Sequence, residues 1–137
     1  MLLRTTADAA FSDCVRERAS WSCEMCGSVP DRRGLHCAHF MSRGHWNTRF
    51  NPSNAASFCW ACHRKTERNR DTVLIPWIKS VHGEQTWDTV FSDAFKPAKG
   101  IRKLVPVIAK HYREELKRME GLRSVGVVGR IEISPWA

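Results

Sequence analysis

The sequence predicts an α+β fold in which a small module held by bound metal follows an N-terminal helix and precedes a helical subdomain. The module is predicted by two C-x-x-C pairs, Cys23/Cys26 and Cys59/Cys62, separated by about thirty residues. Each pair places two thiolates on one tight turn, and a tetrahedral Zn²⁺ ion joins two such turns. We expect no export signal in residues 1–4, so a structural zinc site is favoured over disulfides. The helical subdomain is predicted by apolar stripes after residue 70.

Composition predicts one compact unit. The chain has 137 residues, of which 42% are hydrophobic and 26% charged, which is typical of a globular protein. Its apolar runs are shorter than the roughly 18 to 20 residues that a membrane span needs. We therefore expect no membrane association and a cytoplasmic location.

The positive charge is concentrated in two stretches. The formal net charge is +8, and residues 31–70 and 96–118 each hold eight Lys or Arg against two acidic residues. Two basic blocks on an otherwise slightly acidic chain are typical of a nucleic-acid-binding protein. Solvated surface charge is the alternative explanation of each block.

The first half of the chain alternates helix and strand signals. Thr5 or Thr6 can cap a helix over residues 7–19, whose apolar stripe includes Cys14 as a small buried side chain. Residues 35–40 predict a short strand with Cys37 directed toward the core. Residues 42–50 form a basic loop or the return strand, 51–54 a turn, and the second cysteine pair opens a helix that ends near Asn69.

The second half is predicted to be helical. Three apolar stripes follow one another, the first behind Pro76 and ended by Gly83, and the last with a cationic face. We divide the chain into a zinc-bound module (1–70), a helical subdomain (71–120) and a segment 121–137 that is either an edge hairpin or a flexible tail.

The loop between the cysteine pairs carries groups suited to phosphodiester hydrolysis. That reaction needs a base for water, a divalent cation and donors that hold the phosphate. His39 ends the predicted strand and is a suitable base, because its ordinary pKa of about 6.5 leaves it mostly neutral at pH 7. His63 directly follows Cys62 and is therefore held rigidly enough to bind a second metal.

These residues resemble the ββα-metal, or HNH, nuclease motif in order and spacing, with His39, Asn54 and His63 at its three name-giving positions. The segments 35–40, 42–44 and 48–50 are similar more narrowly to the NinG/Rap recombination endonucleases of lambdoid phages. The resemblance covers about residues 11–119. It implies a hairpin and a helix around one Mg²⁺ or Mn²⁺ ion, with Asn54 bracing the hairpin that carries the base.

The resemblance also implies a substrate and a location. The expected function is a metal-dependent, structure-specific DNA endonuclease (a phosphodiester hydrolase) that cuts branched recombination intermediates such as D-loops and Holliday junctions. The bacteriophage relatives place it in the cytoplasm of a bacterial host cell. A homodimer would suit the symmetry of a junction.

One departure from the motif affects the metal site. Many HNH enzymes have a metal-binding Asp or His directly before the base, where this chain has Ala38. His36 is the expected replacement ligand, and His45 is the alternative. Because of Ala38, a zinc-stabilised DNA-binding protein without cleavage is the second hypothesis. An HNH nuclease of restriction or recombinase-dependent type is the third.

Several side chains are expected to contact DNA. Trp46 either stacks on an unpaired base or covers the loop. The residues expected to contact phosphates are Arg43, His45, Arg49, Arg64 and Lys65.

Overall fold

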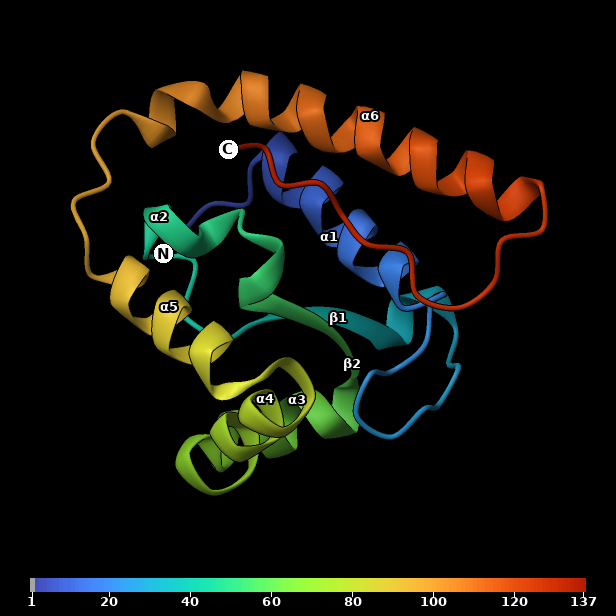
Figure 1. Ribbon diagram of the computed structural model, residues 1–137, viewed down its shortest axis with the longest axis horizontal. Helices are drawn as coiled ribbons and strands as arrows, with labels where there is room; N and C mark the ends of the chain where they lie inside the picture. Colours follow the sequence, from blue (N-terminus) through green and yellow to red (C-terminus); the bar gives the residue numbers. More distant parts are fainter. Residues whose placement is uncertain (1) are drawn as a thin grey trace.

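The computed structural model, which describes residues 2–137, has an α+β fold in which helices surround a small antiparallel sheet (Figure 1). The helices are α1 (Thr6–Arg18), α2 (Trp46–Arg49), α3 (Trp60–Arg68), α4 (Ile75–His82), α5 (Glu84–Ala94) and α6 (Val105–Ser124). The strands are β1 (Leu35–His39) and β2 (Ala55–Cys59). Short 3-10 turns cover Arg32–Gly34, Pro52–Asn54 and Ile101–Leu104, and a π-helical turn covers Arg70–Leu74.

The sheet consists of β1 and β2, paired in antiparallel register from Leu35 opposite Cys59 to His39 opposite Ala55. The strand at β1 was predicted. Residues 42–50 were expected to form a loop or the return strand. The strand alternative is wrong: residues 42–45 are a loop, α2 follows, and the return strand comes after the turn at 51–54. Alanine and serine have low strand propensity, so β2 gave no strand signal, although its first four residues are buried against their neighbours.

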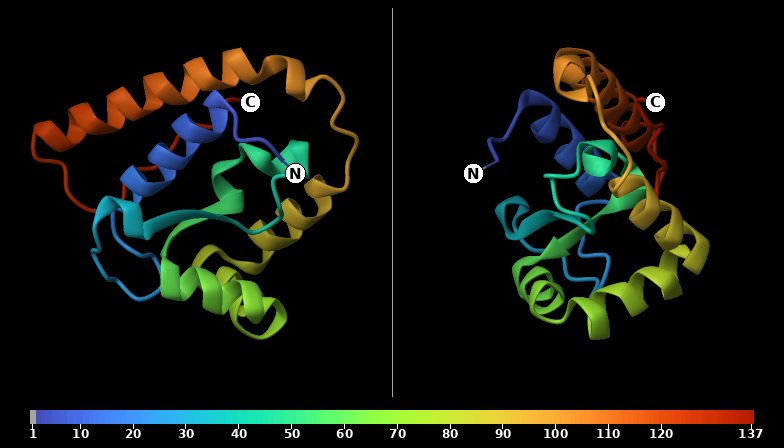
Figure 2. Two further views of the ribbon diagram at one scale, coloured as in Figure 1. Left: turned by 180° about the vertical axis from the view of Figure 1, so that it is seen from behind. Right: turned by 90° about the vertical axis from the view of Figure 1, so that its left-hand side faces the viewer.

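Helix α1 begins one residue before its predicted start and packs against α6. The Thr5 side chain accepts a hydrogen bond from the Asp8 amide, and the Asp8 side chain accepts one from the Thr5 amide, which together form a capping box. Phe11 and Cys14 are fully buried. Figure 2 shows α6 running alongside α1 on the same side of the molecule.

Two apolar clusters lie in the fold. The first joins α1 and α6 with the loop around Phe50, and the second joins the sheet with α4 and α5. Each cluster combines residues from the cysteine module with residues from the helices that follow it. The sheet is therefore held between two sets of helices that are distant from it in sequence.

Helices α4 and α5 confirm the first two predicted stripes in part. Pro76 lies in the first turn of α4, and Gly83 ends it with φ of 91°. Trp87 and Val90 of α5 are buried, as the stripe predicts. Phe91 and Phe95, the other aromatic residues of this stripe, are 48% and 63% exposed and pack against each other instead of entering the core.

The segment after α6 returns across the molecule toward α1 (Figure 1). Residues 125–137 form no strand, so the edge hairpin is excluded. Ile131 and Ile133 are buried in the first apolar cluster, and Arg130 donates to Glu24 beside the first cysteine pair. The tail is thus anchored at Ile131 and Ile133, whereas residues 125–130 before them are exposed. Among residues 2–137, no helix is both long enough and apolar enough to cross a membrane.

Candidate functional site

The four paired cysteines form one cluster that can hold a metal ion. Their Sγ atoms all lie within 4.8 Å of one another, and those of Cys26 and Cys59 are 3.8 Å apart. Tetrahedral zinc with Zn–S bonds of about 2.3 Å places its sulfur ligands roughly 3.8 Å apart. The donor set and its spacing therefore fit a structural Zn²⁺ ion, as the sequence predicted.

The backbone around the cluster is shaped for this role. Gly27, with φ of 77°, lets its amide turn back and donate to the carbonyl of Cys23 at 2.9 Å. Hydrogen bonding from Ser28 lowers the pKa of Cys26 to about 6, which favours the metal-binding thiolate. On the second pair, Cys59 caps α3, so Cys62 lies in the first helical turn.

Glu24, inside the first pair, connects this turn to the rest of the fold. Its Oε2 accepts from the Ser57 amide at 2.7 Å, and its Oε1 accepts from Arg130 at 2.8 Å. This role of Glu24 was not predicted from the sequence. Because its partners are distant in sequence, no local pattern would have identified them.

His36 and His63 meet beside the cysteine cluster. Their Nδ1 atoms are 2.9 Å apart, with the rings nearly perpendicular at 86°. His63 Nε2 lies 3.3 Å from a carboxylate oxygen of Glu67, one helical turn later on α3. Burial lowers the pKa of His63, which keeps this ring neutral and able to bind metal. Glu67 was missed, although its spacing of four residues from His63 would have indicated the contact.

His39 lies in the same hollow as these two rings. A cavity of about 400 Å³ has all three imidazoles in its lining. Regular alternation along a strand would place His36 and His39 on opposite faces of β1. Both imidazoles nevertheless line this one cavity, together with His63 of α3.

The environment of His39 fixes its protonation. Burial lowers its pKa to about 4, so the ring is neutral at pH 7. Its Nε2 lies 3.0 Å from the carbonyl oxygen of Arg49 and, in the neutral ring, donates to it. This contact leaves Nδ1 as the ring nitrogen with a free lone pair.

Asn54 is fully buried and joins the two ends of the loop after β1. Its Oδ1 accepts from the Met41 amide at 2.8 Å, while its Nδ2 donates to the carbonyls of Met41 and Thr48 at 2.9 and 3.0 Å. Thr48 precedes Arg49, whose carbonyl holds His39. Asn54 therefore ties the start of this loop to residue 48, next to the carbonyl that holds His39.

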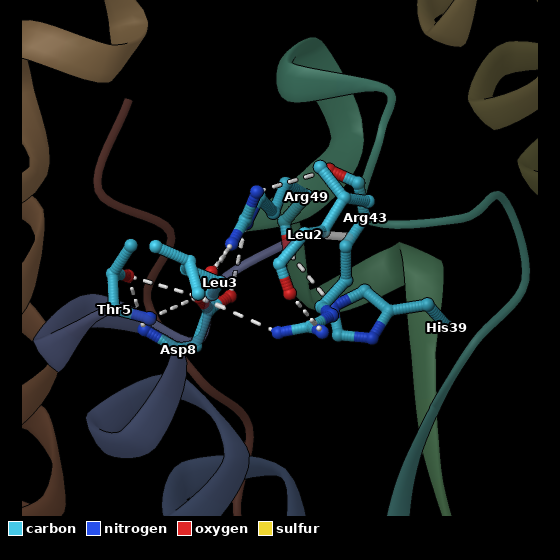
Figure 3. Close-up of polar contacts among 7 residues, drawn as sticks. All are labelled: Leu2, Leu3, Thr5, Asp8, His39, Arg43 and Arg49. Carbon is cyan, nitrogen blue, oxygen red and sulfur yellow. Dashed lines mark hydrogen bonds and ion pairs between the residues drawn. The ribbon is translucent and has the colours of Figure 1, made fainter.

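Arg49 does not face the solvent, so its expected contact with DNA is wrong. Its guanidinium is 1% exposed and donates to both carboxylate oxygens of Asp8, at 3.0 and 2.6 Å (Figure 3). Burial alone would raise the pKa of Asp8, but hydrogen bonds from Arg49 and Thr5 outweigh it and lower the pKa. The buried pair ties α1 to the segment that holds His39.

The other residues expected to contact DNA lie at three different places in the fold. Arg43 is partly exposed, lies 3.7 Å from Asp8 and lines the cavity of the three histidines. Arg64 and Lys65 are exposed on α3. His45, the alternative metal ligand, is turned toward α5, with Nδ1 3.1 Å from the Ala94 carbonyl.

Trp46 covers the loop. Its ring is flanked by the guanidinium carbons of Arg49 and Arg102, at 4.2 and 5.2 Å from the ring centroid. It also packs against the first apolar cluster. Of the two roles expected for Trp46, these contacts agree with covering the loop.

No protein-family model matches the chain, and no curated protein or solved structure matches it either. The fold and the site define an α+β protein with a four-cysteine cluster that can bind zinc. A cavity lined by three histidines lies next to this cluster. The chemistry of that cavity is the basis for a proposed function.

Proposed function

We propose that the protein is a metal-dependent DNA endonuclease of the HNH type that hydrolyses phosphodiester bonds in branched DNA. The observation that carries this proposal is the convergence of His36, His39 and His63 on one cavity. Such a site combines a neutral base with a pair of metal-binding imidazoles beside cationic side chains. These are the groups that phosphodiester hydrolysis needs.

His36 and His63 are suited to hold the catalytic divalent ion. Two nitrogen ligands at about 2.0 to 2.1 Å from one ion lie roughly 3 Å apart, which agrees with the 2.9 Å between their Nδ1 atoms. Glu67 supports the second nitrogen of His63, as carboxylates commonly do for metal-binding histidines. A bound divalent ion would neutralise the charge that develops on the leaving oxygen.

The ligand atoms of the proposed catalytic site influence which divalent ion it prefers. Mg²⁺ prefers oxygen ligands and dehydrates reluctantly, whereas imidazole suits later divalent metals better. With two imidazoles as its proposed ligands, the site favours Mn²⁺ over Mg²⁺. Cleavage is expected to be faster with Mn²⁺ at equal concentration.

His39 is suited to act as the base. Its Nε2–H is occupied by the Arg49 carbonyl, so Nδ1 is the atom that takes the proton from water. A pKa of about 4 makes this ring neutral at physiological pH, at the cost of weaker basicity. The hydrogen bond to a backbone carbonyl also fixes the orientation of the ring.

Arginines around the cavity are suited to hold the phosphate. Arg16, Arg33 and Arg43 line it together with the histidines. Guanidinium groups bind phosphate oxygens in a bidentate manner and stay charged at any working pH. The second basic block, on and before α6, gives a further cationic surface for the arms of a branched substrate.

One observation favours a second function. Ala38 is 4% exposed and supplies no ligand at the position before the base, so a zinc-stabilised DNA-binding protein without cleavage is the alternative. A cleavage panel separates the two. Supercoiled plasmid, linear duplex, D-loop and four-way junction are incubated with the zinc-loaded protein and Mn²⁺, Mg²⁺ or no added metal.

The nuclease proposal predicts metal-dependent products, most abundant from the branched substrates. Gel shifts without products under all metal conditions would contradict it and favour the binding protein. Preferential cutting of linear duplex would keep the nuclease and replace the branched substrate by one of restriction type.

A further inference from the structure

We propose that Trp60 is a stacking platform for an unpaired nucleobase of the substrate strand, next to the candidate metal site. The inference rests on the proposed function in taking nucleic acid as the ligand. It goes beyond that function by assigning a residue that selects unpaired DNA.

Trp60 is unusual in its exposure. It is the first residue of α3, and its side chain is 58% exposed although it is one of the largest apolar groups in the chain. It stands between Cys59 and Cys62, so its backbone belongs to the metal-binding turn. A large aromatic ring on a rigid turn loses little conformational entropy when it binds a ligand.

Helix α3 presents two neighbouring rows of side chains. Trp60, Arg64 and Arg68 follow one another at intervals of four residues, and the guanidinium carbon of Arg64 lies 5.1 Å from the Trp60 ring centroid. His63 and Glu67 form the adjoining row. The stacking group and its cations therefore run parallel to the proposed metal ligands.

One hollow connects the two rows. A cavity of about 420 Å³ is lined by Trp60, Arg64 and Arg68 and, on its other side, by His36, His63 and Glu67. A strand with its phosphates along the arginines would bring a base over the indole while the neighbouring phosphate reaches the histidines. Glu67 is the one acidic group in this lining, and it faces His63.

The chemistry of this surface favours single-stranded nucleic acid as its occupant. Apart from Trp60, the lining consists of charged and imidazole side chains, unlike the apolar core of a protein interface. The arginines complement phosphate charge. Paired bases keep their faces inside the duplex, whereas an unpaired base can place its face on an aromatic ring.

The test measures binding without cleavage. A fluorescein-labelled 15-nucleotide single strand and the blunt duplex of the same sequence are titrated by anisotropy with zinc-loaded full-length protein and no added Mn²⁺ or Mg²⁺. The variants are Trp60→Ala, Trp60→Phe and, as a matched exposed aromatic away from the cavity, Phe95→Ala. Zinc content and melting temperature of each variant are measured alongside.

Loss of a stacked base should raise the Kd of Trp60→Ala for the single strand by about 5- to 100-fold. Trp60→Phe should retain most of the affinity, Phe95→Ala all of it, and duplex binding should change less than twofold in each. An unchanged Kd of Trp60→Ala for the single strand would overturn the proposal. So would equal weakening on both DNAs, or a wild-type protein that does not bind the single strand.

The outcome is separable from that of the nuclease proposal. If wild-type protein gives no metal-dependent products but Trp60→Ala selectively loses single-strand binding, cleavage fails and the platform stands. If products form and Trp60→Ala binds the single strand as the wild type does, the platform fails and cleavage stands.

Discussion

At the scale of single residues, the pair between Asp8 and Arg49 positions the proposed base. The Arg49 side chain donates hydrogen bonds to the Asp8 carboxylate, and its backbone carbonyl accepts one from His39 Nε2. One residue therefore connects α1 to the proposed base. Both partners are almost fully buried, at 3% and 1% side-chain exposure. Removal of the Asp8 charge would leave the Arg49 guanidinium buried without an ion-pair partner.

We predict that Asp8→Asn lowers the free energy of unfolding by about 3 to 5 kcal/mol, because it leaves Arg49 as an uncompensated buried charge. Urea denaturation measures the change. Asp13→Asn is the matched control, since the Asp13 side chain is 45% exposed in its ion pair with Arg16 and should change stability by less than about 1 kcal/mol. Equal effects of the two substitutions would argue against a structural role for the Asp8 pair.

The same pair sets a pH dependence. The pKa of Asp8 in the folded protein is below its ordinary value of 3.8, so the unfolded chain takes up the proton first as the pH falls. The contribution of the pair to stability is therefore complete above about pH 4 and is lost as the pH falls through the lowered pKa. We predict that the urea midpoint of Asp8→Asn falls less between pH 5 and pH 3 than that of the wild type, because the variant lacks this carboxylate.

At the scale of elements, the site is built from β1, the loop that follows it, and α3. Asn54 holds the loop through three buried hydrogen bonds. The loop in turn presents the Arg49 carbonyl to His39. A change at Asn54 should therefore affect both stability and the orientation of the base.

Asn54→Ala should destabilise the protein by about 1 to 3 kcal/mol, because the buried amide and carbonyl of Met41 lose their side-chain partner and the Thr48 carbonyl loses one of its donors. Asn69→Ala makes the same chemical change at an exposed side chain that donates only to the Lys65 carbonyl. We expect it to shift the thermal midpoint little. A midpoint for Asn54→Ala close to that of Asn69→Ala would show that the brace is dispensable.

The elements also show what the sequence could predict. Helix α1, strand β1 and the cysteine pairs have strong local signals, namely caps, alternation and spacing, and these were predicted correctly. Strand β2 was missed because Ala55, Ala56 and Ser57 owe their place to burial against neighbours. Arg49 was assigned to the surface because charge predicts exposure, and its buried partner lies 41 residues away.

In the candidate site, too, features with a local sequence signal were predictable and contacts between distant residues were not. The convergence of His36 and His63 depends on the register between β1 and β2, which the sequence does not specify. The position of Glu67 one turn after His63 was accessible from helical spacing. The exposure of Trp60 was not, because an aromatic residue beside a zinc turn is as easily buried as exposed.

At the scale of the whole molecule, the cysteine cluster adds a metal-binding connection between parts that the second apolar cluster already brings together. It holds the turn at residues 23–26 against the junction of β2 and α3, and Glu24 extends this contact to the tail through Arg130. Loss of the metal would release both the proposed platform at Trp60 and the proposed metal ligand at His63.

Removal of zinc with a strong chelator, or Cys59→Ser, should therefore lower the melting temperature sharply, since a structural zinc contributes directly to folding. Cys37→Ala is the control, because Cys37 packs against the first apolar cluster outside the four-cysteine group. It should retain one zinc per chain and most of the stability. The same melting temperature with and without chelator would contradict a structural metal.

The central claim is that His39 and the pair His36/His63 form one hydrolytic centre. The most direct measurement is the single-turnover rate of Mn²⁺-dependent cleavage of a branched DNA by the wild type, by His39→Ala, and by His111→Ala as a control on α6. We predict that His39→Ala lowers the rate by about 10²- to 10⁴-fold, with zinc content and DNA affinity retained, while His111→Ala cleaves normally. Cleavage by His39→Ala at nearly the wild-type rate would contradict it.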